Sequence, residues 1–259
     1  MLGTMPLIFK EKLLFCKMKK NIVFIALIIV LANTTNAQVD YRTMTWNGII
    51  SNFHINQHWS IQADMHFRST DQWEQFQTII LRPGVSYKFN KKYSLVAGLG
   101  YLNNRTTVGG VADYKPEVQI WQQFWIRNQI GNVHLTNRFS LEDRFIGKFA
   151  VDDDHLKTTS TGFAIRFRYL LRAQFPWKKS KEFKQGFYNY AQQEIFLNLL
   201  HKNLTNGHNF DQIRPVVGFG YRFSPKIDLE SGLQYRFLQS KGTTRTQDAI
   251  MATSCFIRL

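Results

Sequence analysis

Apolar and polar side chains alternate with a period of two along most of this chain. Between residues 133 and 145 the odd-numbered positions are largely apolar, and the even-numbered positions are all polar. Residues 161–175 repeat the pattern, with Phe163 in the apolar set and Arg166 in the polar set. Successive side chains of a β-strand point to opposite faces, whereas a helix would scatter both sets around its circumference. The pattern therefore predicts strands with one apolar and one polar face.

Eleven segments are strand candidates by this criterion. They are residues 42–55, 59–69, 75–89, 93–104, 117–130, 133–147, 161–175, 187–199, 210–223, 226–239 and 248–259. Most are 11 to 15 residues long. Strands in soluble proteins usually have about five or six residues, whereas a strand that crosses a bilayer needs about nine to eleven. We predict an all-β protein, a single antiparallel up-and-down transmembrane β-barrel of about 10 to 12 strands.

The connections between these segments alternate in length, as they do in outer-membrane barrels, where short turns face the periplasm. Tight turns are predicted at 56–58, 90–92, 131–132 and 224–225, and longer polar links at 106–116, 150–160, 200–209 and 240–247. The link at 176–186 breaks the order, because it is long and lysine-rich at a predicted periplasmic position. Bacterial single-chain barrels have even strand counts. An odd count of eleven candidates has two explanations. Either one strand has been missed or wrongly assigned, or the segment after Gln38 passes through the barrel interior before it forms the first strand.

Three of the tight turns share one sequence frame, at residues 53–61, 87–95 and 221–229. Aromatic residues flank each of them. Ordinary turn chemistry accounts for the central Asn and Ser residues, but not for the recurrent aromatics. Amphipathic rings suit the headgroup level of a membrane, so we expect these residues to form the periplasmic aromatic girdle.

The N-terminal segment has the features of a signal peptide. Three lysines precede an uncharged apolar run at residues 22–32, which is too short for a helix that spans a bilayer. Small and polar residues follow, and we expect cleavage after Ala37. We therefore predict a leader at residues 1–37, whose true start is Met18, and an outer-membrane β-barrel domain at 38–259. The expected location is the outer membrane of a Gram-negative bacterium.

The chain is strongly basic, with 33 Lys and Arg against 18 Asp and Glu and a formal net charge of +15. Such a balance suits nucleic acid, an anionic membrane surface or an anionic solute, and export excludes nucleic acid as the expected partner. The expected partners are instead outer-membrane lipid, the barrel-assembly machinery and small anionic solutes. Met251, Cys255 and Ile257 alternate toward the C-terminus as an assembly signal does, although Leu259 replaces the usual terminal aromatic residue.

If the apolar face of each strand meets lipid, the polar face lines the interior and collects most of the charge there. The predicted interior arginines are Arg82, Arg127, Arg138, Arg144, Arg166, Arg168, Arg172, Arg214, Arg222 and Arg236, and the predicted charge partners are Glu117, Glu142, Glu194, Asp228 and Glu230. Paired charges that simply fill a narrow barrel are one interpretation. The other is a narrow lumen that passes or binds small anions, because guanidinium groups suit carboxylate and phosphate ligands.

Two further alternatives remain open, an outer-membrane hydrolase acting on lipid or ester and a soluble exported lipocalin-like β-barrel. The hydrolase would need a serine beside a histidine. Ser140 and His134 share one face of a strand but lie six residues apart, about 20 Å at the rise of a strand. The Asp152–Asp154 run with His155 is expected to be solvated rather than a metal site. The sequence indicates no cofactor and no metal.

Several short motifs, taken in order, resemble those of a known family. They are Trp121, Gln122 and Gln123 on one predicted strand, Arg138 to Arg144 with Glu142 and Phe145 on the next, then residues 194–198, and then Phe210, Asp211, Gln212 and Arg214. The sequence resembles the uncharacterised exported family called domain of unknown function 2490 over about residues 46–259. The resemblance implies an outer-membrane-like barrel with no established activity, and it assigns no catalytic residues.

Overall fold

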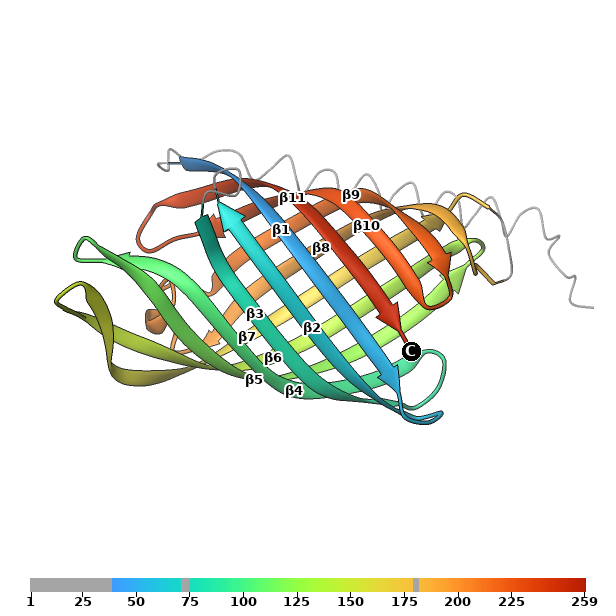
Figure 1. Cartoon of the computed structure of the whole chain (residues 1–259), viewed down its shortest axis with the longest axis horizontal. Coiled ribbons are helices and arrows are strands. Elements are labelled where there is room, and N and C mark those ends of the chain that lie inside the picture. Colours follow the sequence, from blue (N-terminus) through green and yellow to red (C-terminus); the bar gives the residue numbers. More distant parts are fainter. Residues whose placement is uncertain (1–38, 71–74, 179–181) are drawn as a thin grey trace, which may run out of the picture. The chain divides into compact units, whose positions relative to one another are not determined.

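The computed structural model describes residues 39–70, 75–178 and 182–259. These residues form eleven strands that close into one barrel in chain order (Figure 1). The strands are β1 (Val39–His54), β2 (Trp59–Thr70), β3 (Gln75–Lys88), β4 (Tyr93–Val108), β5 (Val111–Ile130), β6 (Val133–Asp152), β7 (His155–Pro176), β8 (Gly186–Leu200), β9 (Phe210–Ser224), β10 (Ile227–Gln239) and β11 (Arg245–Arg258). Every predicted strand is present, so the predicted all-β barrel is confirmed. The predicted leader lies outside the described residues.

The barrel closes through a parallel pair of strands. All consecutive strands pair antiparallel, but β1 and β11 pair in parallel from Val39 beside Arg245 to Asn52 beside Arg258. Eleven strands are joined by ten antiparallel steps, and an even number of reversals leaves the first and last strands running in the same direction. The expectation of an even count was therefore wrong, since a parallel ladder can also seal a ring. As a result, β1 starts at one end of the barrel and the chain ends at the other (Figure 1).

The two ends of the barrel differ. One, the short-turn end, carries the links β1–β2, β3–β4, β5–β6, β7–β8 and β9–β10, and the other, the long-loop end, carries the remaining links. A 3₁₀ helix, Lys202–Leu204, lies in the link between β8 and β9. No helix in the described ranges is long and apolar enough to span a membrane.

Two of the predicted long links are strands instead of loops. β4 and β5 continue as a hairpin to a turn at Gly109 and Gly110, and β6 and β7 continue to a turn at Asp153 and Asp154. Beyond Asn104 in β4, the residues pair only with β5, so this hairpin projects past the closed ring. Figure 1 shows both hairpins standing out from the long-loop end. The prediction of loops failed because a hairpin outside the ring buries no apolar face and reads as polar.

The two projecting hairpins contact each other. The Asp113 carboxylate on the first hairpin accepts hydrogen bonds from the backbone N–H groups of Leu156, at 3.0 Å, and Tyr114, at 2.7 Å. These hydrogen bonds lower the pKa of Asp113, because they favour its charged form. The ammonium group of Lys115 lies 4.7 Å from the ring centroid of Phe149 on the second hairpin.

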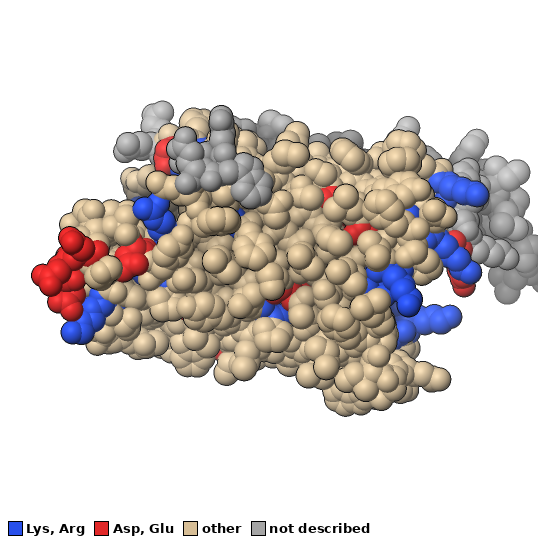
Figure 2. Space-filling model, viewed as in Figure 1, with Lys and Arg blue, Asp and Glu red and all other residues tan. Residues whose placement is uncertain are grey.

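The outer face of the barrel is apolar. Large hydrophobic side chains are exposed along all eleven strands, among them Ile49, Met65, Leu99, Val118, Leu141, Phe163, Leu199, Val217, Leu233 and Met251. Figure 2 shows one flank with few charged atoms, which gather mainly toward the two ends. A soluble protein seldom exposes so continuous an apolar surface.

A pair of facing glycines makes room for a large interior side chain. Gly84 in β3 lies opposite Gly98 in β4, and the fully buried indole of Trp121 covers both. The ladder between β3 and β4 is interrupted at Pro83, which has no N–H to donate. The free carbonyl of Leu99 accepts a hydrogen bond of 2.9 Å from Nε1 of Trp121. The glycines therefore provide space for a ring and its hydrogen bond.

The β9–β10 hairpin repeats this arrangement. Gly218 lies opposite Gly232, and the ring of Tyr190 from β8 covers them. The ladder between β9 and β10 is interrupted at Pro215, as it is at Pro83 in the β3–β4 hairpin. The sequence repeat around the turns thus extends into the strands and positions buried aromatic rings in the interior.

Candidate functional site

The barrel encloses a cavity of about 890 Å³. Its lining extends from Thr205 and Lys241 at the long-loop end to Asp228 and Arg258 at the short-turn end. Twelve arginines line it, Arg68, Arg82, Arg127, Arg138, Arg144, Arg166, Arg168, Arg172, Arg214, Arg222, Arg236 and Arg258, against six carboxylates, Asp64, Glu117, Glu194, Asp211, Asp228 and Glu230. Even with the fully buried Glu142 and Asp248 counted, positive charge is in excess.

All the predicted interior arginines line this cavity, and so do four of the five predicted charge partners. The fifth, Glu142, is 0% exposed and does not line the cavity, but it is paired with Arg166 and Arg168, which do. The structure therefore brings the predicted residues together in one place. Their role in binding anions stays a prediction.

Glu142 on β6 lies at the centre of the charge network. Its Oε2 accepts a hydrogen bond of 2.6 Å from Arg166, and its Oε1 accepts one of 2.6 Å from Arg168, both on β7. Arg82 on β3 approaches the same Oε1 at 3.4 Å. Arg166 also contacts Asp211 at 3.2 Å. One fully buried carboxylate thus links three strands, which makes it an essential counter-charge.

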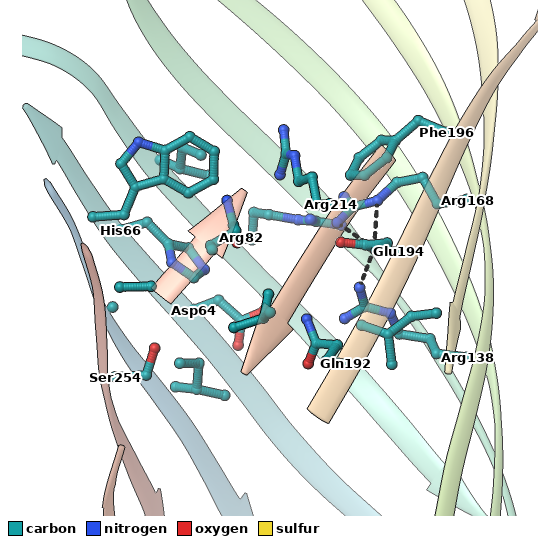
Figure 3. A pocket seen from close by; sticks show the side chains of 18 of the residues that line it. Asp64, His66, Arg82, Arg138, Arg168, Gln192, Glu194, Phe196, Arg214 and Ser254 are labelled. Atoms are coloured by element: carbon teal, nitrogen blue, oxygen red, sulfur yellow. Dashed lines mark hydrogen bonds and ion pairs between the residues drawn. The ribbon is translucent and has the colours of Figure 1, made fainter. Parts of the chain in front are cut away.

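Glu194 on β8 is the second centre of the network. It accepts hydrogen bonds from Arg138, at 2.5 Å, and from Arg168, at 2.7 Å. Figure 3 shows Glu194 between these two arginines. Arg168 therefore bridges Glu142 and Glu194, and the network spans β6, β7 and β8.

Most of the other interior carboxylates are also paired with arginines, whereas Asp64 accepts hydrogen bonds from Gln62. Arg144 binds Glu117 through two hydrogen bonds of 2.7 and 2.8 Å. Asp228 accepts hydrogen bonds of 2.8 Å from both Arg222 and Arg258 at the short-turn end. The remaining pairs are Arg172 with Glu230, which also accepts a hydrogen bond from Tyr188, and Arg236 with Asp248. Much of the positive charge is thus neutralised locally.

Two aromatic rings hold arginines in place. The guanidinium carbons of Arg68, Arg214 and Arg236 lie 4.0, 4.9 and 5.3 Å from the ring of Trp46. Phe196 likewise has Arg168 and Arg214 at 4.4 Å. Stacking on a ring leaves the N–H edge of a guanidinium group free to donate hydrogen bonds. Stacking therefore orients these arginines and leaves their N–H groups available, for carboxylates in the case of Arg168 and Arg236.

Phe183 narrows the short-turn end of the interior. This residue of the β7–β8 link is 7% exposed and packs against Tyr188 with 5.8 Å between ring centroids. Arg222 donates a hydrogen bond of 2.7 Å to the carbonyl of Phe183 and lies over its ring. The link that broke the predicted alternation thus supplies a side chain to the interior.

The structure does not assemble the hydrolase candidates. The Oγ of Ser140 and the Nε2 of His134 are both buried, and neither has a hydrogen-bond partner among the described residues. Within those residues, no group of three or more His, Cys, Asp or Glu side chains is arranged to hold a metal ion.

Sequence reasoning missed several charged interior residues, namely Asp64, Arg68, Asp211, Asp248 and Arg258. Arg68 shares its strand face with Gln62, Asp64 and His66, so the alternation along β2 already contained the signal. The other three lie within four residues of a strand end, where a short alternating run does not define a face.

Comparison with protein families identifies one that matches residues 43–247, described as Protein of unknown function (DUF2490). No curated protein matches the chain, and no solved structure does so either. The match extends from β1 to the start of β11 and includes most of the residues that line the cavity. The chain therefore belongs to the DUF2490 family of proteins of unknown function.

Proposed function

We propose that this protein is an outer-membrane β-barrel whose arginine-rich interior admits and binds small anions. The observation that carries the proposal is the cavity, which is lined from end to end and has twice as many arginines as carboxylates in its lining. Guanidinium groups select oxyanions, because their donors match the geometry of carboxylate and phosphate groups.

The outer face supports the membrane part of the proposal. Exposed hydrophobic side chains cover the strands, and the charged side chains collect inside the ring and toward its ends. An arginine on the lipid face would cost about 2–4 kcal/mol at the bilayer midplane. Trp59, Tyr87 and Phe89 pack edge to face beside the turns at the short-turn end, as expected for an interfacial girdle.

Cell fractionation tests the location. We expect the protein in the outer-membrane fraction, with a band that migrates differently on a gel before and after heating, because a folded barrel resists detergent until it is heated. A periplasmic, soluble protein whose migration does not depend on heating would contradict the proposal and favour the lipocalin-like alternative.

Planar bilayers test the passage of anions. We expect stepwise conductance and, under a potassium chloride gradient, a reversal potential that indicates anion selectivity. Lys241 is an exposed residue at the long-loop mouth of the cavity. Lys241→Glu should lower the anion-to-cation permeability ratio by about twofold at low salt, because a reversed charge at the mouth repels anions.

The control for this experiment is Lys157→Glu, which makes the same charge change on the projecting β6–β7 hairpin. Lys157 is exposed and does not line the cavity. Its variant should conduct as the unchanged protein does. If the bilayer showed no conductance, or if the two variants had equal effects, the interior arginines would instead serve only to fill the barrel with paired charges.

A further inference from the structure

Four interior arginines have no hydrogen-bonded carboxylate partner; one of them, Arg127, donates to Ser94, and the other three are Arg68, Arg82 and Arg214. Arg68 makes no hydrogen bond or ion pair within the described part of the chain, although its Nε is buried. In Arg82, both Nε and Nη2 are buried without a hydrogen-bond partner, and the nearest carboxylate oxygen, in Glu142, is 3.4 Å away. Arg214 donates only to the neutral Gln212, at 2.9 Å. Most other cavity arginines are paired with a carboxylate.

Arg68 and Arg214 lie close to each other, and Arg82 lines the same cavity. Arg68 from β2 and Arg214 from β9 lie against the same ring of Trp46, although their strands are on different sides of the barrel. Figure 3 shows Arg82 and Arg214 between His66 on one side and Glu194 on the other. All three arginines line the cavity.

Arg82 and Arg214 occupy related places in the repeated hairpins. Each directly precedes a proline, Pro83 or Pro215, at which the ladder to the next strand is interrupted. Arg82 and Arg214 are each 8% exposed, so both are almost fully buried. The two hairpins thus present to the same cavity one guanidinium group apiece that has no hydrogen-bonded carboxylate, although Arg82 lies 3.4 Å from Glu142.

Such an arrangement is unfavourable without a bound anion. Arg214 is buried and is repelled by Arg68, Arg236 and Arg168, and Glu194, which is already paired with Arg138 and Arg168, offsets this repulsion only in part. A carboxylate offers two oxygens and one negative charge. A phosphate group offers more oxygens and up to two negative charges, which fits three guanidinium groups better.

We infer that Arg68, Arg82 and Arg214 form a binding site for a phosphate group, either free phosphate or a phosphate monoester. Trp46 orients Arg68 and Arg214, and the N–H edges of the arginines donate to the phosphate oxygens. The site deepens the proposed function, since it rests on the same anion-accepting interior and names the anion.

Calorimetric titration of the full barrel in detergent tests the site, at constant ionic strength. The probes are inorganic phosphate, glycerol 3-phosphate and, for comparison, acetate. We expect phosphate to bind and acetate not to saturate. The double variant Arg68→Gln and Arg214→Gln should weaken phosphate binding by about a hundredfold, because each of the two charged hydrogen bonds contributes about tenfold. Tighter binding of glycerol 3-phosphate than of inorganic phosphate would identify an organic phosphate as the ligand.

The matched control is Arg258→Gln. Arg258 also lines the cavity, but it is paired with Asp228, which keeps Arg222 as a partner in the variant. Phosphate binding should be unchanged in this control, and heat-dependent gel migration shows that each variant is folded.

Two results would overturn the phosphate site, namely phosphate binding no tighter than that of acetate, or equal binding by the folded double variant and the unchanged protein. Anion-selective conductance in bilayers would leave the proposed function standing in either case. A soluble protein, or a barrel that conducts no ions, could still bind phosphate through these arginines. Such a result would overturn the proposed membrane location or the proposed passage of anions, and it would leave the phosphate site standing.

Discussion

Replacing Glu142 by glutamine should lower the free energy of unfolding by about 3–5 kcal/mol, the range for breaking one side of a buried ion pair. The substitution keeps the size of the side chain and removes only its charge. Arg166 and Arg168 would then face a neutral amide at a fully buried position inside the barrel. Denaturant unfolding of the purified barrel, followed by tryptophan fluorescence and by heat-dependent gel migration, measures the change.

Asp152→Asn is the control for the loss of one carboxylate. Asp152 forms an ion pair of 3.3 Å with Lys157 on the projecting hairpin, and both side chains are mostly exposed. Exposed pairs contribute between zero and about 1 kcal/mol. If Glu142→Gln shifted the unfolding midpoint no more than Asp152→Asn did, Glu142 would not be the central counter-charge of the network.

Replacing Gly98 by alanine should be at least as damaging, at about 3 kcal/mol or more, because overpacking against rigid backbone is costly. A Cβ atom on Gly98 would lie 2.1 Å from the carbonyl oxygen of Pro83 and 2.6 Å from the Cα of Gly84. Both atoms belong to the neighbouring strand, so neither can rotate away. We expect little or no folded barrel, measured as the fraction that shows heat-dependent migration after refolding.

Gly100→Ala tests whether this effect is specific to the site. It makes the same substitution two residues further along β4, on the same face of the strand. There the nearest atom to a new Cβ is the Cβ of Gln119, at 3.3 Å, and a shift of a few tenths of an ångström between the two strands relieves the contact. The Gly100 variant should fold nearly as well as the unchanged protein. Equal folding yields for the two variants would contradict the account of the glycine pair.

The strands and their faces could be predicted from the sequence because alternation is a local property. Each residue's parity along its own strand decides whether it faces outward, as for Leu141, or inward, as for Arg138. The collection of arginines in the interior follows from the same parity. The local alternation therefore predicts the strands of the barrel and the charged side chains that face its interior.

Features that depend on neighbouring strands could not be predicted in this way. Arg166 and Glu142 are 24 residues apart in the chain, and Arg138 and Glu194 are 56 apart, so their pairing depends on register and on barrel closure. The alternation has the same appearance in rings with odd and even strand counts, so it did not reveal the parallel seam. Trp121 was also not foreseen in the interior, because the space it fills is made by glycines on two other strands.

The parallel seam gives the molecule two distinguishable ends. Val39 and Leu259 leave the ring on opposite sides, whereas a barrel with an even strand count returns both ends to one side. In a sealed membrane, a peptide fused directly before Val39 and another fused after Leu259 would face different compartments. A protease added to one compartment would then remove only one of them. The orientation of the barrel can therefore be read from its own two ends, without altering any loop or interior residue.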